Sequence, residues 1–224
     1  MPTSFSEVQA VQLQSQNPNP VQQYLLENEG VSRIHITGAS GSGVSTLGTN
    51  LASALSVPVI DVDNYYWFPT DPPFTTKRQI HERISLLKPI LMQGQEENGG
   101  WILSGSMGTW GGELMEDVEH VIFVDTTNDV RMKRLKQREF KRYGERILEG
   151  GDMYEESIKF LEWAAAYEDP GLEEGRSRAR HEKWLREVKV PVTRLSGDQE
   201  ESAVLKEALQ ALKRDGEKGN ITNT

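Results

Sequence analysis

The stretch GASGSGVST at residues 38–46 decides the fold of this chain, and it directly follows the apolar run VSRIHIT at residues 31–37. Its glycines are Gly38, Gly41 and Gly43. Glycine lets a backbone turn tightly with successive N–H groups pointing inward, and such a turn cradles a phosphate group. The stretch fits the pattern G-x-x-x-x-G-K-[ST], except that Val44 stands where the pattern has lysine. The sequence therefore predicts a nucleotide-phosphate loop without its usual cation.

The residues after the loop predict a helix that adds to phosphate binding. Leucines recur at every fourth position, Leu47, Leu51 and Leu55, so the apolar face of a helix begins near Val44. The start of this helix points its positive dipole end at the loop, and Ser45 stands where a hydroxyl ligates Mg²⁺. A flexible glycine–serine linker is the alternative, and the flanking strand and helix argue against it. The residues that we expect to contact ATP are Gly38, Ser40, Gly41, Ser42, Gly43, Val44, Ser45 and Thr46.

Short apolar runs alternate with helical patterns along the rest of the chain. The runs predict five strands, at residues 32–37, 57–61, 100–104, 119–124 and 190–195. This alternation is typical of βαβ units, in which helices join parallel strands across both faces of a sheet. We therefore expect a three-layer α/β/α fold with a five-stranded parallel sheet.

Three further helices are predicted from their start signals and apolar spacing. TKRQ contains a capping box of Thr76 and Gln79, and DMYE contains a weaker one that begins at Asp152. The last helix is expected over residues 199–213. The apolar residues that follow the two boxes are Ile80, Ile84, Leu87, Ile158, Leu161 and Trp163.

Length and composition favour one α/β domain with a core of its own. The chain has 224 residues, a formal net charge of −9 and no cysteine, so disulfide frameworks and thiolate zinc sites are excluded. An acidic chain is a poor nonspecific ligand for nucleic acid or an anionic membrane. No apolar stretch is long enough for a membrane span, and the first basic residue is Arg33, which argues against a targeting peptide and favours a cytoplasmic protein.

The chain divides into one domain and two polar ends. Residues 1–30 are rich in glutamine and proline and poor in large apolar side chains, so we expect a flexible N-terminal extension. The domain is expected over residues 31–214, and residues 215–224 are expected to form a disordered tail.

Two aspartates close the second predicted strand, in the sequence VIDVDNYYW. Residues two apart on a strand share a face, so Asp61 and Asp63 are both expected in the crevice at the carboxyl edge of the sheet. We predict that Asp61 holds Mg²⁺ together with Ser45, and that Asp63 accepts a proton from an attacking hydroxyl. Loop capping is the alternative for either aspartate alone.

An aromatic segment follows the aspartates. Its rings either stack on a base or another ring of a ligand, or pack together as the core of a loop. They belong to Tyr65, Tyr66, Trp67, Phe68 and Phe74.

The segment RMKRLKQREFKRYGER at residues 131–146 holds eight basic and two acidic residues in an otherwise acidic chain. Arg131, Arg134, Arg138 and Arg142 are spaced by three and four, so they lie on one face of a helix. A solvated helix face is the alternative. Beside a phosphate loop, we interpret this stripe as a clamp over transferring phosphates, with Arg138 and Arg142 as catalytic residues.

The order of these motifs resembles the superfamily of nucleoside monophosphate kinases and shikimate/gluconate kinases, and is most similar to small adenylate-kinase-like P-loop proteins. The likeness spans about residues 32–213 and rests on GASGSGVST, DVD, VIFVDTT, RLKQR and VTRLSGD. It implies a P-loop NTPase fold with a helical lid, ATP and Mg²⁺ as cofactors, and phosphoryl transfer to a nucleoside, a nucleotide or a small metabolite.

The resemblance also implies roles for particular segments. Arg134 would stack on adenine and Arg138 would touch phosphate. Residues 140–182 would form the lid, residues 64–98 would bind the phosphoryl acceptor, and SGD at residues 196–198 would pass near the base.

Two residues depart from the pattern of that superfamily, namely Val44 and Ser104, where many relatives have an acidic residue at the end of the third strand. Phosphoryl transfer depends on positioning and charge, so we expect another cation to replace the lysine. The candidates are Lys136, Lys141, Arg142, Arg176, Arg178 and Arg180. A working kinase with a relocated cation is the prediction. The alternatives are a non-catalytic nucleotide-binding module that acts as a sensor or regulatory partner, and a protein that acts on nucleic acid.

Overall fold

The computed structural model describes residues 33–108, 110–169 and 176–221. The N-terminal extension expected over residues 1–30 lies outside these residues, as do residues 222–224 of the expected tail.

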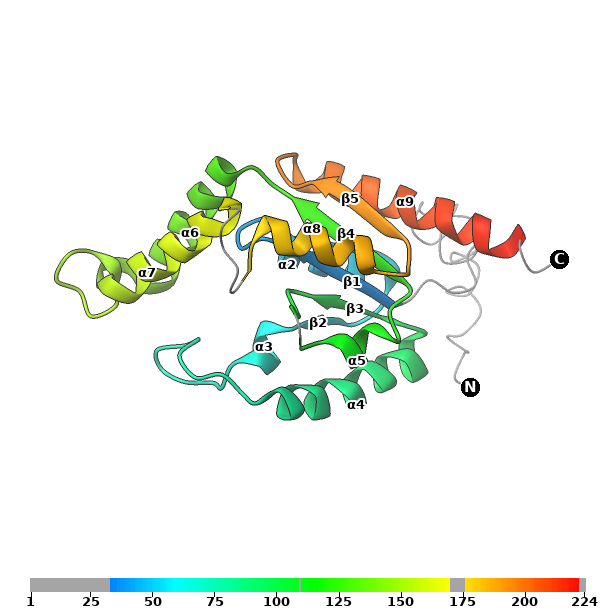
Figure 1. The fold of residues 1–224 in the computed structure, drawn as a ribbon, viewed down its shortest axis with the longest axis horizontal. Helices are drawn as coiled ribbons and strands as arrows, with labels where there is room; N and C mark the ends of the chain where they lie inside the picture. The colour runs from blue at the N-terminus through cyan, green and yellow to red at the C-terminus, as the bar shows by residue number, and fades with distance from the viewer. Residues whose placement is uncertain (1–32, 109, 170–175, 222–224) are drawn as a thin grey trace, which may run out of the picture.

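Five parallel strands form one sheet in the order β2-β3-β1-β4-β5 (Figure 1). This confirms the predicted fold class, and each strand begins and ends within two residues of the predicted bounds. Along β1, Ile34 and Ile36 face one side of the sheet while His35 and Thr37 face the other, and all four are buried. The strands are β1 (Arg33–Gly38), β2 (Val59–Asp61), β3 (Trp101–Ser104), β4 (His120–Asp125) and β5 (Val192–Ser196).

Helices cover both faces of the sheet. On one face, α2 (Val44–Leu55) and α9 (Glu201–Ile221) pack on Ile34, Ile36 and Ile122. On the other face, α4 (Ile80–Asn98), α5 (Gly112–Met115) and α8 (Arg178–Glu187) pack on Leu103 and Phe123. Within the described residues, no helix combines the length and apolar character that crossing a membrane requires.

A helical arm, residues 128–168, projects beyond the sheet (Figure 1). It consists of α6 (Asn128–Tyr143), η1 (Gly144–Ile147), α7 (Tyr154–Ala165) and η2 (Ala166–Glu168), and α7 packs along α6. The segment that we expected to be a lid, residues 140–182, contains most of this arm and the start of α8. Because Leu185 anchors α8 in the core, that helix is part of the sheet's covering layer. Residues 170–175 of the expected lid lie outside the described residues, and the lid over residues 140–182 stays a prediction.

The predicted start signals of two helices were wrong. The capping box of α4 joins Gln79 to Glu82, whose carboxylate accepts the Gln79 backbone N–H at 2.7 Å, so Thr76 has no part in it. The sequence contains two overlapping candidate boxes, Thr76 with Gln79 and Gln79 with Glu82, and the helix begins at the second. Asp152 does not cap α7, because its carboxylate is held by Arg146 at 2.7 and 2.9 Å.

Some apolar residues of these helices do not face the core. Ile80 is 52% exposed, and Ile158 and Trp163 are 39% exposed, because the first turn of α4 and these positions of α7 pack against no sheet. The last helix is longer than predicted. It ends at Ile221 instead of residue 213, so it includes residues 215–221, which we expected to be disordered. Once a helix has formed, each further residue that joins it gains a backbone hydrogen bond, which favours the longer helix.

Candidate active site

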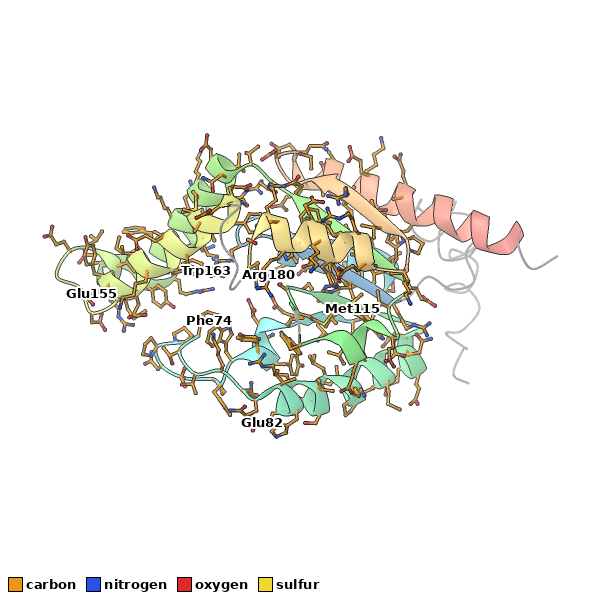
Figure 2. The ribbon with its side chains drawn as sticks, viewed as in Figure 1. Phe74, Glu82, Met115, Glu155, Trp163 and Arg180 are labelled. Carbon is orange, nitrogen blue, oxygen red and sulfur yellow. The ribbon has the colours of Figure 1, made fainter. Side chains whose placement is uncertain are left out.

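The carboxyl ends of the strands open into one pocket of about 1630 Å³. Its walls come from the loop after β1, the segment after β2, the helical arm and α8. Figure 2 shows Phe74, Trp163 and Arg180 around this space, each from a different part of the chain. A pocket for one drug-sized ligand is roughly 300–1,000 Å³, so this one accommodates a nucleotide together with a second molecule. All of the predicted nucleotide, metal and catalytic residues line it.

The loop at residues 38–46 has the backbone that its glycines were expected to provide. Gly41 and Gly43 have φ angles of 81° and 101°, in the left-handed region that other residues rarely adopt. Gly43 is the N-cap of α2, so the helix starts directly beneath the loop. The Ser42 hydroxyl is buried and has no hydrogen-bond partner within the described part of the chain. The loop thus offers backbone N–H groups and a helix start to an anion.

Two other turns hold the loop from behind. The Thr126 hydroxyl donates to the Ser42 carbonyl at 2.9 Å. Gly197, in the SGD turn after β5, lies so close that a Cβ there would be 2.4 Å from the same carbonyl oxygen. Asp198 in turn accepts hydrogen bonds from the backbone and the hydroxyl of Thr127. The late SGD motif therefore packs directly against the phosphate loop.

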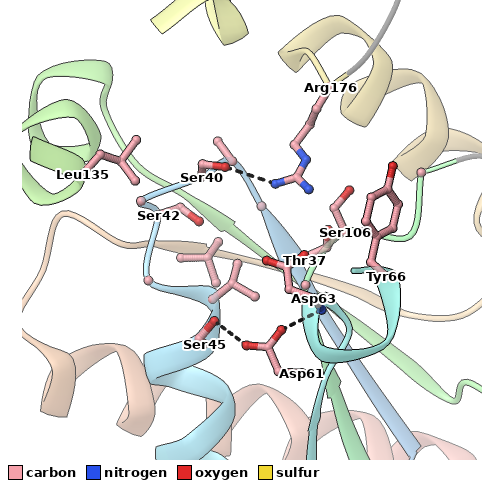
Figure 3. A pocket seen from close by; sticks show the side chains of 18 of the residues that line it. Thr37, Ser40, Ser42, Ser45, Asp61, Asp63, Tyr66, Ser106, Leu135 and Arg176 are labelled. Atoms are coloured by element: carbon pink, nitrogen blue, oxygen red, sulfur yellow. Dashed lines mark hydrogen bonds between the residues drawn. The ribbon is translucent and has the colours of Figure 1, made fainter. Parts of the chain in front are cut away.

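The two aspartates lie beside the loop, as predicted, but for a different reason. Only Asp61 belongs to β2; Asp63 is the first residue of the short helix α3 (Asp63–Tyr66). Strand alternation therefore does not align them. Instead, one oxygen of Asp61 accepts the Asp63 backbone N–H at 2.9 Å and the other accepts the Ser45 hydroxyl at 3.2 Å (Figure 3).

The Ser45 and Asp61 oxygens form the group that would hold a magnesium ion. Both are hard oxygen ligands, and their hydrogen bond brings them together at the start of α2. Magnesium is usually bound by one or two such protein ligands together with substrate phosphates, which the adjacent loop is built to receive. The residues present therefore fit this ion.

The environment of Asp63 raises the pKa of its carboxyl group. Although solvent still reaches the side chain, the surrounding pocket walls reduce its hydration, and this is the main cause. The negative charge of Asp61 adds to the rise, while Arg176, Arg138 and Arg142 oppose it, in that order. A carboxylate with a raised pKa is a better proton acceptor than an ordinary one.

Three arginines of α6 line the pocket as predicted. A Cβ on Gly43 would lie 3.9 Å from the Arg134 guanidinium, so that guanidinium extends over the end of the loop. Lost hydration and the nearby Arg142 lower the pKa of Arg138. The Arg142 guanidinium lies 4.9 Å from the centre of the Phe74 ring, so the arm touches the segment opposite it.

The fourth arginine of the stripe, Arg131, is not part of the pocket wall. Its side chain is fully buried and donates to the carbonyl of Ser40 at 3.2 Å, to the carbonyl of Ala164 at 3.3 Å and to Asn128 at 2.9 Å. It therefore ties the phosphate loop to the end of α7. Its spacing resembles that of the other three arginines, and nothing local in the sequence distinguishes it.

Arg176 both lines the pocket and contacts the loop, and the sequence indicated it only as one candidate among several. Figure 3 shows it pointing into the pocket, where it donates to the Ser40 hydroxyl at 3.3 Å. Arg180 also lines the pocket, whereas Lys136 and Lys141 do not. Arg178 is held by Asp125 and Glu168, at 2.8 and 2.6 Å, and does not line the pocket.

The two departures from the phosphate-loop pattern have distinct surroundings. Val44 is 9% exposed and packs in the core beneath the loop with Leu47 and Ile36, so apolar contacts occupy the lysine position. Ser104 is buried at the end of β3, next to Gly48 of α2, and its hydroxyl has no partner within the described residues.

The sequence of this chain is similar to those of known proteins. Residues 34–158 match the family described as AAA domain. Uncharacterized protein YqaC of Bacillus subtilis (strain 168) is 45% identical over 165 residues, which are 74% of this chain and 88% of that protein.

Solved structures share the fold at low sequence identity. A sugar kinase from Janibacter sp. HTCC2649 has a TM-score of 0.50 and 15% identity, over 82% of this chain and 95% of that one. A gluconokinase from Sinorhizobium meliloti 1021 has a TM-score of 0.50 and 18% identity, over 86% and 98%. The five-stranded parallel sheet with its flanking helices is thus the P-loop α/β fold of such kinases.

Proposed function

We propose that this chain, which belongs to the AAA domain family, is a P-loop kinase that transfers the γ-phosphoryl group of ATP to a small-molecule acceptor. The observation that carries the proposal is the joining of three groups at one pocket. The phosphate loop, the Ser45–Asp61 pair and Asp63 are connected by hydrogen bonds at 3.2 and 2.9 Å. The fold that the chain shares with two small-molecule kinases supports it.

Each group has a role in the proposed transfer. The loop N–H groups and the start of α2 bind the phosphates of ATP. Ser45 and Asp61 would hold Mg²⁺, which when bound would neutralise charge on the phosphates. Asp63 takes the proton of the acceptor hydroxyl. The acceptor oxygen bonds to the γ-phosphorus while the bond from that phosphorus to the departing ADP oxygen breaks.

Arginines of the pocket would replace the missing lysine. Arg176 touches the loop through Ser40, and Arg138 and Arg142 lie on the arm above it. All three lie close enough to Asp63 to affect its pKa, so their charge reaches the place where the phosphoryl group would move. A fixed cation at that place stabilises the transition state more than the bound substrate.

The test is phosphoryl transfer from ATP in the presence of Mg²⁺ to a panel of hydroxyl and phosphate acceptors. We expect product formation with at least one acceptor, and a loss of about 10²-fold or more in the Asp63→Asn variant. ATP binding by calorimetry, without turnover toward any acceptor, would contradict the proposal.

A non-catalytic nucleotide-binding module is the second candidate function. The burial of Val44 in the core and of Ser104 at the end of β3 favours it, because the usual charges around the γ-phosphate are absent from both positions. Nucleotide affinity that is the same in the parent protein and in Asp63→Asn, together with no transfer in either, would select this candidate.

A further inference from the structure

Part of the pocket is bounded by an aromatic wall, which we define as Tyr66, Trp67, Phe74 and Trp110. The rings are in mutual contact. Tyr66 lies 4.9 Å from Trp67 and 6.1 Å from Trp110 between ring centres, and Trp67 lies 6.2 Å from Phe74. This wall begins one helical turn from Asp63, because Tyr66 is the last residue of α3.

A buried cation fixes the wall in place. The Arg83 guanidinium lies 3.8 Å from the centre of the Tyr66 ring and 5.1 Å from that of Trp110, and only 7% of Arg83 is exposed. Its Nε donates to the Arg78 carbonyl at 2.9 Å, while Arg78 donates to the carbonyl of Trp67. Arg83 does not itself line the pocket, so it supports the rings from behind. The wall is therefore formed before a ligand arrives.

Ring faces select for particular chemistry. They offer stacking and dispersion to a flat molecule, and they offer no hydrogen bonds to hydroxyl groups. An open-chain polyol placed against them could pair a hydroxyl with Lys77, whose ammonium lies 5.9 and 5.6 Å from the centres of the Tyr66 and Trp67 rings. Its other hydroxyls would be desolvated against the rings, at a cost for each. A flat ring would gain contact area and keep its polar substituents free to point elsewhere.

We infer that the acceptor is a planar-ring compound that carries a hydroxyl group, held with its ring on the aromatic wall and its hydroxyl toward Asp63. This inference rests on the proposed function, because it names the substrate class of the same reaction. In that reaction the hydroxyl oxygen bonds to the γ-phosphorus of ATP, the bond to ADP breaks, and the hydroxyl proton passes to Asp63.

The experiment first fills the nucleotide site with Mg²⁺ and a non-hydrolysable ATP analogue, so that a ring compound cannot occupy the adenine position. Two ring probes with hydroxyl groups, pyridoxine and thymidine, are then compared with two polyols, gluconate and glycerol. Binding is measured by calorimetry and by tryptophan fluorescence, which reports on Trp67, Trp110, Trp163 and Trp184, the tryptophans that line the pocket. The part of the quenching that Trp67→Leu removes is the part that belongs to the wall. We expect binding and fluorescence quenching by a ring probe and no such change with either polyol.

A matched pair of variants tests the location. Trp67→Leu removes a ring that lines the pocket, and Phe68→Leu removes the neighbouring ring, which stacks on Arg78 and does not line it. The first variant should weaken ring-probe binding about tenfold and the second should leave it unchanged. Melting curves of both variants establish that they are folded.

Three results would overturn the inference. These are tighter binding of a polyol than of either ring probe, equal ring-probe affinity in the two variants, and no ring-probe binding up to about 10 mM. Transfer from ATP to a polyol alone would refute the inference and leave the proposed kinase standing. Ring binding that Trp67→Leu weakens, without transfer to any acceptor, would refute the kinase and leave the ring site standing.

Discussion

Asp63 is held in a setting that disfavours its charge, because reduced hydration and the neighbouring Asp61 both raise its pKa. At neutral pH the carboxyl group is ionised, and its ionisation costs more free energy in the folded protein than in the unfolded chain. A raised pKa in the folded state gives stability at low pH and withdraws it as pH rises through that pKa. Removing the charge should therefore stabilise the protein above that pKa.

We predict that Asp63→Asn lowers turnover about 10²-fold or more, leaves ATP affinity nearly unchanged and raises the melting temperature at pH 7. The rise in melting temperature should vanish near pH 3, where both side chains are neutral. Asp152→Asn is the control, because the pKa of Asp152 is lowered by Arg146 and the residue lies outside the pocket. A melting temperature of Asp63→Asn below that of the parent at pH 7 would contradict the argument.

Val44 presents the opposite situation, an apolar side chain where a charge is usual. Because its contacts lie in the core, Val44→Lys should lower the melting temperature and should not raise phosphoryl transfer, since Arg176, Arg138 and Arg142 already supply positive charge. Val44→Ala removes the same packing without adding a charge and serves as the comparison. Phosphoryl transfer that is faster in Val44→Lys than in both the parent protein and Val44→Ala would show that the arginines do not compensate for the missing lysine.

At the level of residues, the sequence predicted which side chains meet but not how they are held. The phosphate loop could be predicted because its glycines and its flanking elements are local in the chain. The positions of Asp61 and Asp63 were predicted from strand alternation, whereas a hydrogen bond across a helix start aligns them. The alternative that the sequence left open, loop capping by a single aspartate, describes what Asp61 does.

At the level of elements, Arg131 joins the arm to the loop. Its partners are the carbonyls of Ser40 and Ala164, which lie 91 and 33 residues away in sequence. The sequence could not reveal this role, because every residue carries a backbone carbonyl and the residue type does not mark the ones that accept from Arg131. It could reveal that α6 is a helix with a basic face, since that signal repeats within the element.

We predict that Arg131→Lys destabilises the fold by about 3 kcal/mol, because a lysine cannot reach several fixed acceptors with one ammonium group and leaves buried carbonyls unpaired. ATP affinity should fall as well, since the Ser40 carbonyl loses its anchor. Chemical denaturation and calorimetry measure the two effects. Arg146→Lys, at the exposed pair with Asp152 in the same arm, should change neither. Equal stability of the two variants would refute the role of Arg131.

At the level of the whole molecule, His35 and His181, two of the three histidines that are buried in the described part of the chain, should set the response to acid. Burial lowers the pKa of His35 to about 4 and that of His181 to about 3, from an ordinary value of 6.5. Groups with a lowered pKa in the folded state contribute stability above the unfolded-state value, and that stability is lost as pH falls below it. The relevant window is therefore between pH 6.5 and about 4.

We predict that the free energy of unfolding falls by about 1.4 kcal/mol per pH unit for each histidine below pH 6.5. His35 stops contributing near pH 4, and His181 near pH 3. Denaturation curves at successive pH values provide the measurement. His35→Gln should halve the slope between pH 6 and pH 4.5, because glutamine can still donate to the Leu103 carbonyl that His35 contacts at 3.0 Å. A slope that His35→Gln does not change would contradict the assignment.

The architecture of the whole molecule could be predicted further than its site. The parallel sheet follows from five short apolar runs, of which β1, β3 and β4 are almost wholly buried, and this pattern does not depend on how the loops are arranged. The direction of the arm and the place of α8 could not be predicted, because both depend on which faces of amphipathic helices meet. Leu185, His181 and Trp184 give α8 a face that fits the sheet, and only the three-dimensional arrangement shows it.

The buried Arg131 guanidinium has a thermodynamic consequence for this protein. One guanidinium donates hydrogen bonds to both the phosphate loop and the end of α7. A displacement of either segment therefore changes how favourable each position of the other segment is. Linkage of this kind is reciprocal: if nucleotide binding favours one position of the arm by some factor, fixing the arm in that position strengthens nucleotide binding by the same factor. An antibody fragment that grips α7 would thus act as an allosteric effector of a loop it never touches.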